Sequence, residues 1–223
     1  FMKLLHTADW HLGQTFFEYD RRLEHSLFLE WLKKQVKTHG VDVLLIAGDV
    51  FDGPNPSADS QRMYYRFLQE VTVENPELQV IIISGNHDSA ARLEAPYALL
   101  EMINVTVRAV VKRGVDGEID CEHFVVPLNK GGYCLAVPYL RQGDYPGVET
   151  EGNPYMEGGR ELYARLLQRL WARRETNQAI LAVGHLQATG SEIAEKDYSE
   201  RTVIGGLECV SPDTFSEKIA YTA

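Results

Sequence analysis

The sequence lacks any long hydrophobic run, and no apolar segment approaches the ~20 residues needed to span a bilayer. Near its start there is no basic region followed by an apolar stretch and a cleavage site, so no signal peptide is visible. Cysteine is scarce, with three widely spaced residues and no CxxC pair: Cys121, Cys134 and Cys209. Such a set predicts buried thiols in a reducing compartment. We therefore expect a cytoplasmic protein that does not enter a membrane.

Several catalytic signatures are also missing. No GxxxxGK[ST] loop is present, so the chain should not itself hydrolyse ATP as a P-loop enzyme. No serine or cysteine stands in a nucleophile elbow, which argues against a covalent intermediate. Basic residues are outnumbered, 22 Lys and Arg against 32 Asp and Glu, and the formal net charge of -10 excludes an indiscriminate polyanion binder. A nuclease whose carboxylates hold metal remains compatible with this charge.

One stretch, residues 41–52 (VDVLLIAGDVFD), organises the chain. Its continuous apolar run, Val43 to Ala47, is typical of a strand buried on both faces, as in a sheet covered by helices. Gly48 allows a tight turn, and Asp49 then lies just past the carboxyl end of the strand. Ligands of open α/β sheets collect at that edge. Alone, this pattern would indicate only a strand followed by a turn.

Three other expected strands end in similar polar residues. The endings are Asp9-x-His11 after residues 3–8, Gly85-Asn86-His87-Asp88 after residues 78–83, and Gly184-His185 after residues 179–183. In an extended D-x-H triplet both side chains point to the same side and can grip one ion. Brought to one sheet edge, the four endings supply carboxylate, imidazole and amide ligands for two metal ions. Two ions can hold a phosphate between them and activate water.

Helical periodicity predicts helices at about residues 21–38, 57–73, 90–102 and 159–176. In the first, Leu23, Leu27, Trp31 and Leu32 form the expected buried stripe, and His25 and His39 are interpreted as surface histidines. In the last, the expected stripe is Leu162, Leu166, Leu170 and Trp171. Residues 105–137 hold short β-rich pieces separated by glycine turns, which predict antiparallel hairpins in a second sheet. Residues 144–159 and 187–206 are expected to be loops, and a last strand begins in 218–222.

The four endings resemble the motifs of the calcineurin-like metallophosphoesterases, D-x-H, G-D-x-x-D, G-N-H-[DE] and G-H. Longer segments are similar to the nucleases of this family: TADWHLGQTFFEYDRRLEH, LLIAGDVFDGPNPSADSQRMYYRFL, IISGNHDSAARLEAP and GHLQATGSEIAEKDYSERTVIGGLECV. Together they extend from Thr7 to Val210. The resemblance implies a four-layer α/β/β/α sandwich, an α/β fold.

The resemblance also implies a role for each motif residue. Asp9 and His11 would hold the first metal, Asp49 would bridge, and Asn86 and His185 would hold the second. The ions implied are two divalent cations, Mn²⁺ first and Mg²⁺ as the alternative.

Two further residues would act in catalysis rather than as ligands. His87 would face the scissile phosphate as general acid or as a stabiliser of the transition state. Asp88 would support the imidazole ring of His87.

The family's nucleases further imply an activity and partners. These are ATP-dependent exonuclease action on double-stranded DNA ends and endonuclease action on single strands or hairpins, in DNA recombination, replication and repair. ATP would be hydrolysed by an SMC-like ATPase partner, and the protein would be a homodimer. We expect dimerisation through the helices at about 57–73 and 90–102, which carry Met63, Tyr64, Tyr65, Leu93, Tyr97 and Leu100.

The family's fifth motif, G-H-x-H, is absent from residues 1–223. The expectation is therefore an incomplete nuclease domain, truncated at its C-terminal side, with a capping domain and a partner-binding tail beyond residue 223. By the family pattern this form lacks one histidine at each metal and should be inactive. His6 and His123 are interpreted as structural rather than as substitutes.

Three other functions compete with a nuclease. Protein phosphatases of the superfamily carry Arg-Gly after the second Asp of G-D-x-x-D, whereas this chain has Gly53-Pro54. A phosphodiesterase for small molecules such as cyclic nucleotides shares the short motifs, and only the long matching segments favour a nuclease over it. A metal-poor scaffold of the same fold, which binds proteins only, would be expected to have lost ligand positions that are intact here.

Overall fold

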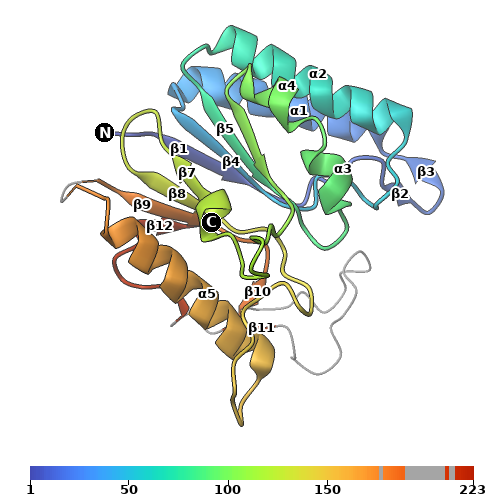
Figure 1. Cartoon of the computed structure of the whole chain (residues 1–223). Coiled ribbons are helices and arrows are strands. Elements are labelled where there is room, and N and C mark those ends of the chain that lie inside the picture. Colours follow the sequence, from blue (N-terminus) through green and yellow to red (C-terminus); the bar gives the residue numbers. More distant parts are fainter. Residues whose placement is uncertain (176–177, 189–208, 211–213) are drawn as a thin grey trace.

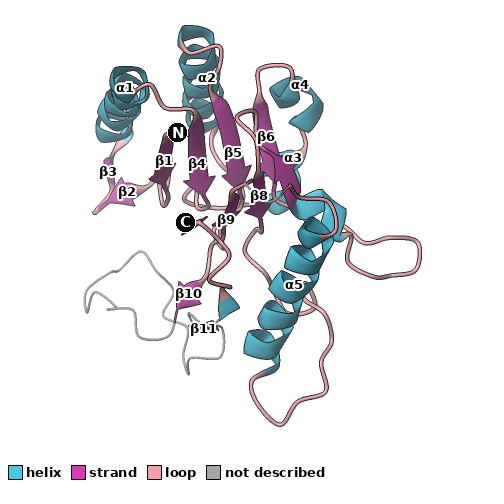
Figure 2. Ribbon diagram, turned by 90° about the vertical axis from the view of Figure 1, so that its left-hand side faces the viewer, coloured by secondary structure: helices cyan, strands magenta, loops and turns pink. Residues whose placement is uncertain are grey.

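The chain folds into two sheets packed face to face, with helices on both outer faces (Figures 1 and 2). The computed structural model describes residues 1–175, 178–188, 209–210 and 214–223, and every structural statement below concerns these residues. The expected loop at 187–206 lies largely outside them. The architecture is the predicted four-layer α/β/β/α arrangement.

The first sheet is parallel, with strand order β1-β4-β5-β6. Its inner strands β4 and β5 are buried at every position, as their uninterrupted apolar sequences predict. Parallel pairing brings the carboxyl ends of all four strands to one edge of the sheet. The strands are β1 (Leu4–Thr7), β4 (Val43–Ala47), β5 (Gln79–Ile83) and β6 (Val105–Arg108).

The second sheet has the order β12-β9-β8-β7 and is mixed. Its strands are β7 (Val125–Pro127), β8 (Tyr133–Ala136), β9 (Ile180–Val183) and β12 (Tyr221–Thr222). Only β7 and β8 pair antiparallel, because β9 runs parallel to both β8 and β12. Two small ribbons lie outside the sheets, β2–β3 (Thr15–Phe16, Tyr19–Asp20) and β10–β11 (Gln187–Ala188, Cys209–Val210).

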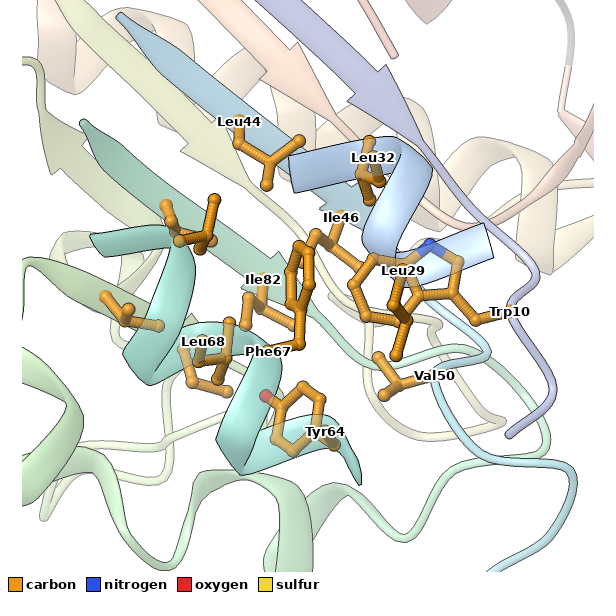
Figure 3. Close-up of a cluster of buried hydrophobic side chains, with 14 of the residues drawn as sticks. Trp10, Leu29, Leu32, Leu44, Ile46, Val50, Tyr64, Phe67, Leu68 and Ile82 are labelled. Atoms are coloured by element: carbon orange, nitrogen blue, oxygen red, sulfur yellow. The ribbon is translucent and has the colours of Figure 1, made fainter. Parts of the chain in front are cut away.

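Three buried clusters join the four layers. The first lies between the first sheet and its helices, where Trp10, Phe67 and Ile82 meet (Figure 3). The second joins the two sheets through side chains such as Leu45 and Cys134, and the third packs α5 on the second sheet. The helices are α1 (Arg22–His39), α2 (Ala58–Glu74), α3 (Ala90–Glu94), α4 (Tyr97–Glu101), the 3-10 turn η1 (Cys121–Phe124) and α5 (Pro154–Trp171).

The buried face of α1 differs from the predicted stripe. Leu23, Leu27 and Trp31 are exposed, and only Leu32 of the expected set is buried. The helix instead buries His25, Leu29, Leu32 and Val36, so interpreting His25 as a surface histidine was wrong. Both sets repeat with helical spacing, and the packing of α1 against the first sheet selects one of them.

The predicted helix at 90–102 is two short helices. Pro96 lies between α3 and α4. The helix is interrupted there because proline lacks the amide hydrogen that a continuous helix needs. The prediction for 105–137 was also wrong in part, since β6 joins the first sheet in parallel with β5. Only β7 and β8 form a hairpin in the second sheet.

The last helix, α5, begins five residues earlier than predicted. The Asn153 side chain accepts hydrogen bonds from the amides of Tyr155 and Met156, and Pro154 occupies the first turn. Its predicted stripe is buried except for Trp171, which is 39% exposed. Cys121 and Cys134 are buried free thiols, as predicted. None of the helices in the described part of the chain combines the length and apolarity required to cross a membrane.

Candidate metal centre

The loops that follow β1 and β4 continue side by side beyond the ends of their strands. The amide of Asp9 donates to the carbonyl of Gly48 at 3.1 Å, that of His11 to Asp49 at 3.0 Å, and that of Leu12 to Val50 at 2.9 Å. The two ligand-bearing motifs are therefore held together by backbone hydrogen bonds. Their side chains project from one edge of the first sheet.

Three motif residues have left-handed backbone conformations that non-glycine residues seldom adopt. The φ angles are 56° at Asp9, 45° at His11 and 49° at Asp49. Such conformations cost about 1–3 kcal/mol each and gather at functional sites. They also show that the prediction of an extended D-x-H backbone was wrong, because neither Asp9 nor His11 is extended.

The carboxylate of Asp49 lies at the centre of the site and is 3% exposed. Its Oδ2 atom is 3.6 Å from Nε2 of His185, 3.8 Å from Nε2 of His11 and 4.0 Å from Nε2 of His87. Its Oδ1 atom accepts a hydrogen bond from the His87 amide at 2.9 Å. One buried carboxylate oxygen thus faces three imidazole nitrogens, which is an arrangement suited to cations.

Potential ligand atoms form two groups that share Asp49. One contains His11 and His87, and the other contains Asp9 and His185. Sequence reasoning placed Asp9 and His11 on the same ion, whereas the structure places them in different groups. The assignment of each residue to an ion, and of His87 to catalysis rather than metal binding, stays a prediction.

Two glycines leave room for these side chains. A Cβ atom at Gly85 would lie 2.0 Å from Oδ1 of Asp49, and one at Gly48 would lie 2.5 Å from Nδ1 of His185. Gly48 also has a φ of 91°. Any other residue at either position would displace a candidate ligand.

The environment of His185 tests whether these residues fit a metal ion. Its Nδ1 lies 2.8 Å from the Ala47 carbonyl, which accepts the Nδ1 proton and leaves the Nε2 lone pair available. Nε2 of His185 lies 2.9 Å from Oδ1 of Asn86. Neighbouring ligand atoms at metal–ligand distances of about 2.1 Å are about 3 Å apart in an octahedral site. The donor set therefore fits a divalent cation.

Sequence reasoning missed one contributor to the site, Asp52. Its carbonyl oxygen is 3.0 Å from Nδ1 of His87, and its Oδ1 is 3.4 Å from Nδ1 of His11. The Asp52 carbonyl thus holds the Nδ1 side of the His87 ring and the Asp52 carboxylate lies beside Nδ1 of His11, while both Nε2 atoms face Asp49. The signal was present in the second aspartate of the G-D-x-x-D motif.

The expected contact between Asp88 and the ring of His87 is replaced by another. The Asp88 carboxylate accepts hydrogen bonds from the amides of Gly85, Phe51 and Val50, while the His87 ring bonds to Asp52. Burial raises the pKa of Asp88, although the amides of Gly85 and Phe51 oppose this shift.

An open groove of about 660 Å³ borders the site on the side of the D-x-H loop. Besides Asp9 and His11 it is lined by Arg21, whose guanidinium donates to Gln14 at 2.6 Å, and by the polar side chain of Glu24. The groove gives the metal centre access to solvent, with a cation nearby that is suited to a phosphate.

The two histidines that were expected to be structural contact residues outside the candidate metal centre. His6 is exposed on β1, with Nδ1 3.4 Å from the Tyr221 hydroxyl. His123 lies in η1, with Nε2 3.5 Å from Glu94. Neither belongs to the two ligand groups.

A family model described as calcineurin-like phosphoesterase matches residues 2–208. Curated relatives include proteins named as the SbcD subunit of the nuclease SbcCD. The protein of Rhodobacter capsulatus is 40% identical over 100% of this chain and 56% of its own length. That of Escherichia coli strain K12 is 32% identical over 96% of this chain and 53% of its own length. That of Bacillus subtilis strain 168 is 28% identical over 100% of this chain and 56% of its own length.

This chain therefore spans about half the length of the curated relatives it matches. The matched residues include the whole first sheet, strands β7, β8 and β9 of the second sheet and every candidate ligand, and the ligand groups agree with the metal-dependent chemistry of the family. The chain belongs to the calcineurin-like phosphoesterase family.

Proposed function

We propose that this protein is the nuclease subunit of an SbcCD-type complex, an SbcD, and that it hydrolyses phosphodiester bonds in DNA. The observation that carries the proposal is the buried Asp49 oxygen with three imidazole Nε2 atoms within 4.0 Å. The names of the relatives, each a subunit of a nuclease, support a nucleic acid as the substrate. When bound, two divalent ions would supply phosphate binding and an activated water. Mn²⁺ is the metal that we propose first.

In the proposed division of labour, Asp9, His11, Asn86 and His185 would hold the ions and Asp49 would serve both. All five present oxygen or imidazole nitrogen to the site, and these are donors that Mn²⁺ accepts.

His87 is the proposed catalytic residue. Its Nδ1 proton is held by the Asp52 carbonyl at 3.0 Å, so Nε2 is the atom that exchanges a proton with the reacting phosphate. Nε2 of His87 is buried and has no hydrogen-bond partner among the described residues, which suits a group whose partner is the substrate.

The finer activity proposed is that of the SbcCD complex. With SbcC hydrolysing ATP, the protein would act as a double-strand exonuclease and as a single-strand or hairpin endonuclease in cytoplasmic DNA recombination, replication and repair. We also propose that residues 1–223 form the nuclease domain, alongside a capping domain and an SbcC-binding tail. Support comes from the relatives, which are about twice as long as the chain.

A homodimer is part of the proposal, with the interface on α2 and on the α3–α4 segment. Tyr97, Leu99 and Met102 are exposed at α4 by 48%, 70% and 82%, which leaves an apolar surface available for a partner. Three residues expected at the interface, Tyr64, Leu93 and Leu100, are instead buried within the subunit and do not contribute. Replacing both Leu99 and Met102 with glutamate should convert a dimer to a monomer in analytical ultracentrifugation. A wild-type protein that is monomeric at micromolar concentration would contradict the dimer.

The test of function is Mn²⁺-dependent cleavage of linear duplex and hairpin DNA by the full-length protein with SbcC. We expect cleavage of both, with ATP required for the duplex. A small phosphodiester such as bis(p-nitrophenyl) phosphate is the companion substrate. Cleavage of the small ester without any cleavage of DNA would identify a small-molecule phosphodiesterase instead. Failure to bind Mn²⁺ would identify a scaffold.

A further inference from the structure

Two aspartates at the site bind each other's backbone. Oδ1 of Asp49 accepts the amide of His87 at 2.9 Å, the residue before Asp88. In return, Asp88 accepts the amides of Phe51 at 3.0 Å and Val50 at 3.2 Å, the residues after Asp49. Each carboxylate therefore satisfies the turn that presents the other. We call this pair of contacts the aspartate clasp.

The amides held by Asp88 have no access to water in the folded protein. Val50 is fully buried and Phe51 is 6% exposed, and both side chains lie in the cluster under the helices (Figure 3 shows Val50). An unpaired buried amide costs about 1–3 kcal/mol, so the turn depends on an acceptor at this point. Asp88 also accepts the amide of Gly85 at 2.9 Å, which closes its own turn.

The turn at Asp49 is strained and is held from two sides. On one side the D-x-H loop bonds to it, through the His11 amide on the Asp49 carbonyl and the Leu12 amide on the Val50 carbonyl. On the other side the Asp88 carboxylate accepts the two neighbouring amides of Val50 and Phe51, one on each oxygen. Without it, the left-handed φ of 49° at Asp49 would be free to relax, and Oδ2 would turn away from the three imidazoles.

We propose that Asp88 is a positioning residue that acts through the backbone of Val50 and Phe51 to aim Asp49 Oδ2 between the two metal positions. The inference rests on the proposed metal site and corrects the expectation that Asp88 supports the ring of His87. Asp88 is 1% exposed and its oxygens are committed to amides, so it does not meet the substrate.

The chain contains a matched control for this role. Glu94 is 6% exposed and accepts the amides of Ala109 and Val110 at 2.7 and 2.8 Å. It clamps α3 to the end of β6 by the same chemistry but belongs to neither ligand group. Loss of its carboxylate should affect stability without affecting metal binding.

The test compares Asp88→Asn with Glu94→Gln by calorimetric Mn²⁺ titration and thermal unfolding of the full-length protein. Both variants should melt at lower temperature than wild type. Only Asp88→Asn should also lose Mn²⁺ affinity, by about 10–100-fold, as expected when a group that orients a ligand is lost. An unchanged affinity in Asp88→Asn, or an equal loss in both variants, would overturn the proposal.

A measurement on the wild-type protein covers the case in which Asp88→Asn fails to fold. Amide hydrogen exchange of Val50 and Phe51 should be slow in metal-free protein, because the clasp and not the metal holds this turn. Fast exchange there that becomes slow only with Mn²⁺ would overturn the proposal. Wild-type protein that binds no Mn²⁺ would refute the proposed function, while slow exchange would still support the clasp.

Discussion

The two sheets contribute to the site in different ways. The first supplies Asp9, Asp49 and His87 from loops joined by backbone hydrogen bonds and by the aspartate clasp. The second supplies His185, whose ring reaches across to the Ala47 carbonyl of the first sheet at 2.8 Å. The difference indicates that the first sheet fixes most of the candidate ligands through its own hydrogen bonds. Among the described residues, the second sheet adds one candidate ligand, whose ring is oriented by a contact with the first sheet.

The largest expected effect comes from removing His87, the proposed catalytic residue beside the first sheet. His87→Ala should reduce cleavage by about 10²–10⁴-fold, because proton transfer is lost. Mn²⁺ binding measured by calorimetry should be retained, and His6→Ala, on the exposed face of β1, should cleave as wild type. Normal cleavage by a metal-loaded His87→Ala protein would refute the assignment.

The next effect concerns the carboxylate shared by both ligand groups. Asp49→Asn should weaken Mn²⁺ binding more than Asp52→Asn does, because the amide removes a charge that faces both ions. Asp52→Asn changes only the carboxylate beside Nδ1 of His11, because the carbonyl that contacts His87 belongs to the backbone, so it should cost about 10-fold in affinity. Equal Mn²⁺ affinities of the two variants, measured by calorimetric titration, would contradict a bridging role for Asp49.

A smaller effect separates the glycines of the two sheets. Gly85→Ala places a Cβ 2.0 Å from the Asp49 carboxylate, whereas Gly184→Ala meets the Tyr163 hydroxyl at 3.0 Å. Gly85→Ala should lower the free energy of unfolding by about 1–3 kcal/mol and weaken metal binding. Gly184→Ala should retain most of the stability and most of the metal affinity of the wild-type protein. The comparison of the sheets would fail if Gly184→Ala proved the more damaging in denaturant unfolding and Mn²⁺ titration.

The smallest effect is a pH dependence within the first sheet. Burial alone would raise the pKa of Glu94, but hydrogen bonds with His123, the Val110 and Ala109 amides and Lys112 lower it to about 2. Because the carboxyl pKa is lower in the folded than in the unfolded protein, ionised Glu94 stabilises the fold at pH values above 4.5, the pKa in the unfolded chain. This stabilisation is lost as the pH falls toward 2. In urea unfolding, Glu94→Gln should cost about 1.5–3 kcal/mol at pH 7. The cost should shrink at pH 3, and a constant cost across this range would contradict the assignment.

Much of the fold was predictable because its signals are local. The apolar runs of β4 and β5 and the polar residues that follow the strands are contiguous in the sequence. The buried face of α1 was not predictable, since Leu23-Leu27-Trp31 and Leu29-Leu32-Val36 are both apolar series with helical spacing. The choice between them depends on what packs against the helix.

The amino-acid sequence by itself determined which residues reach the site, because strand ends of a parallel sheet share one edge and Asp9, His11, Asp49, Asn86 and His87 follow those ends. Only the tertiary structure decided what each one does there. The turns at Asp49 and Asp88 are far apart in the sequence, and their exchange of amide hydrogen bonds exists only once β4 and β5 have paired. The motifs mark Asp52 and Asp88 in the sequence, but a motif does not say which distant groups its residues contact, so the contacts of both became visible only in the folded chain.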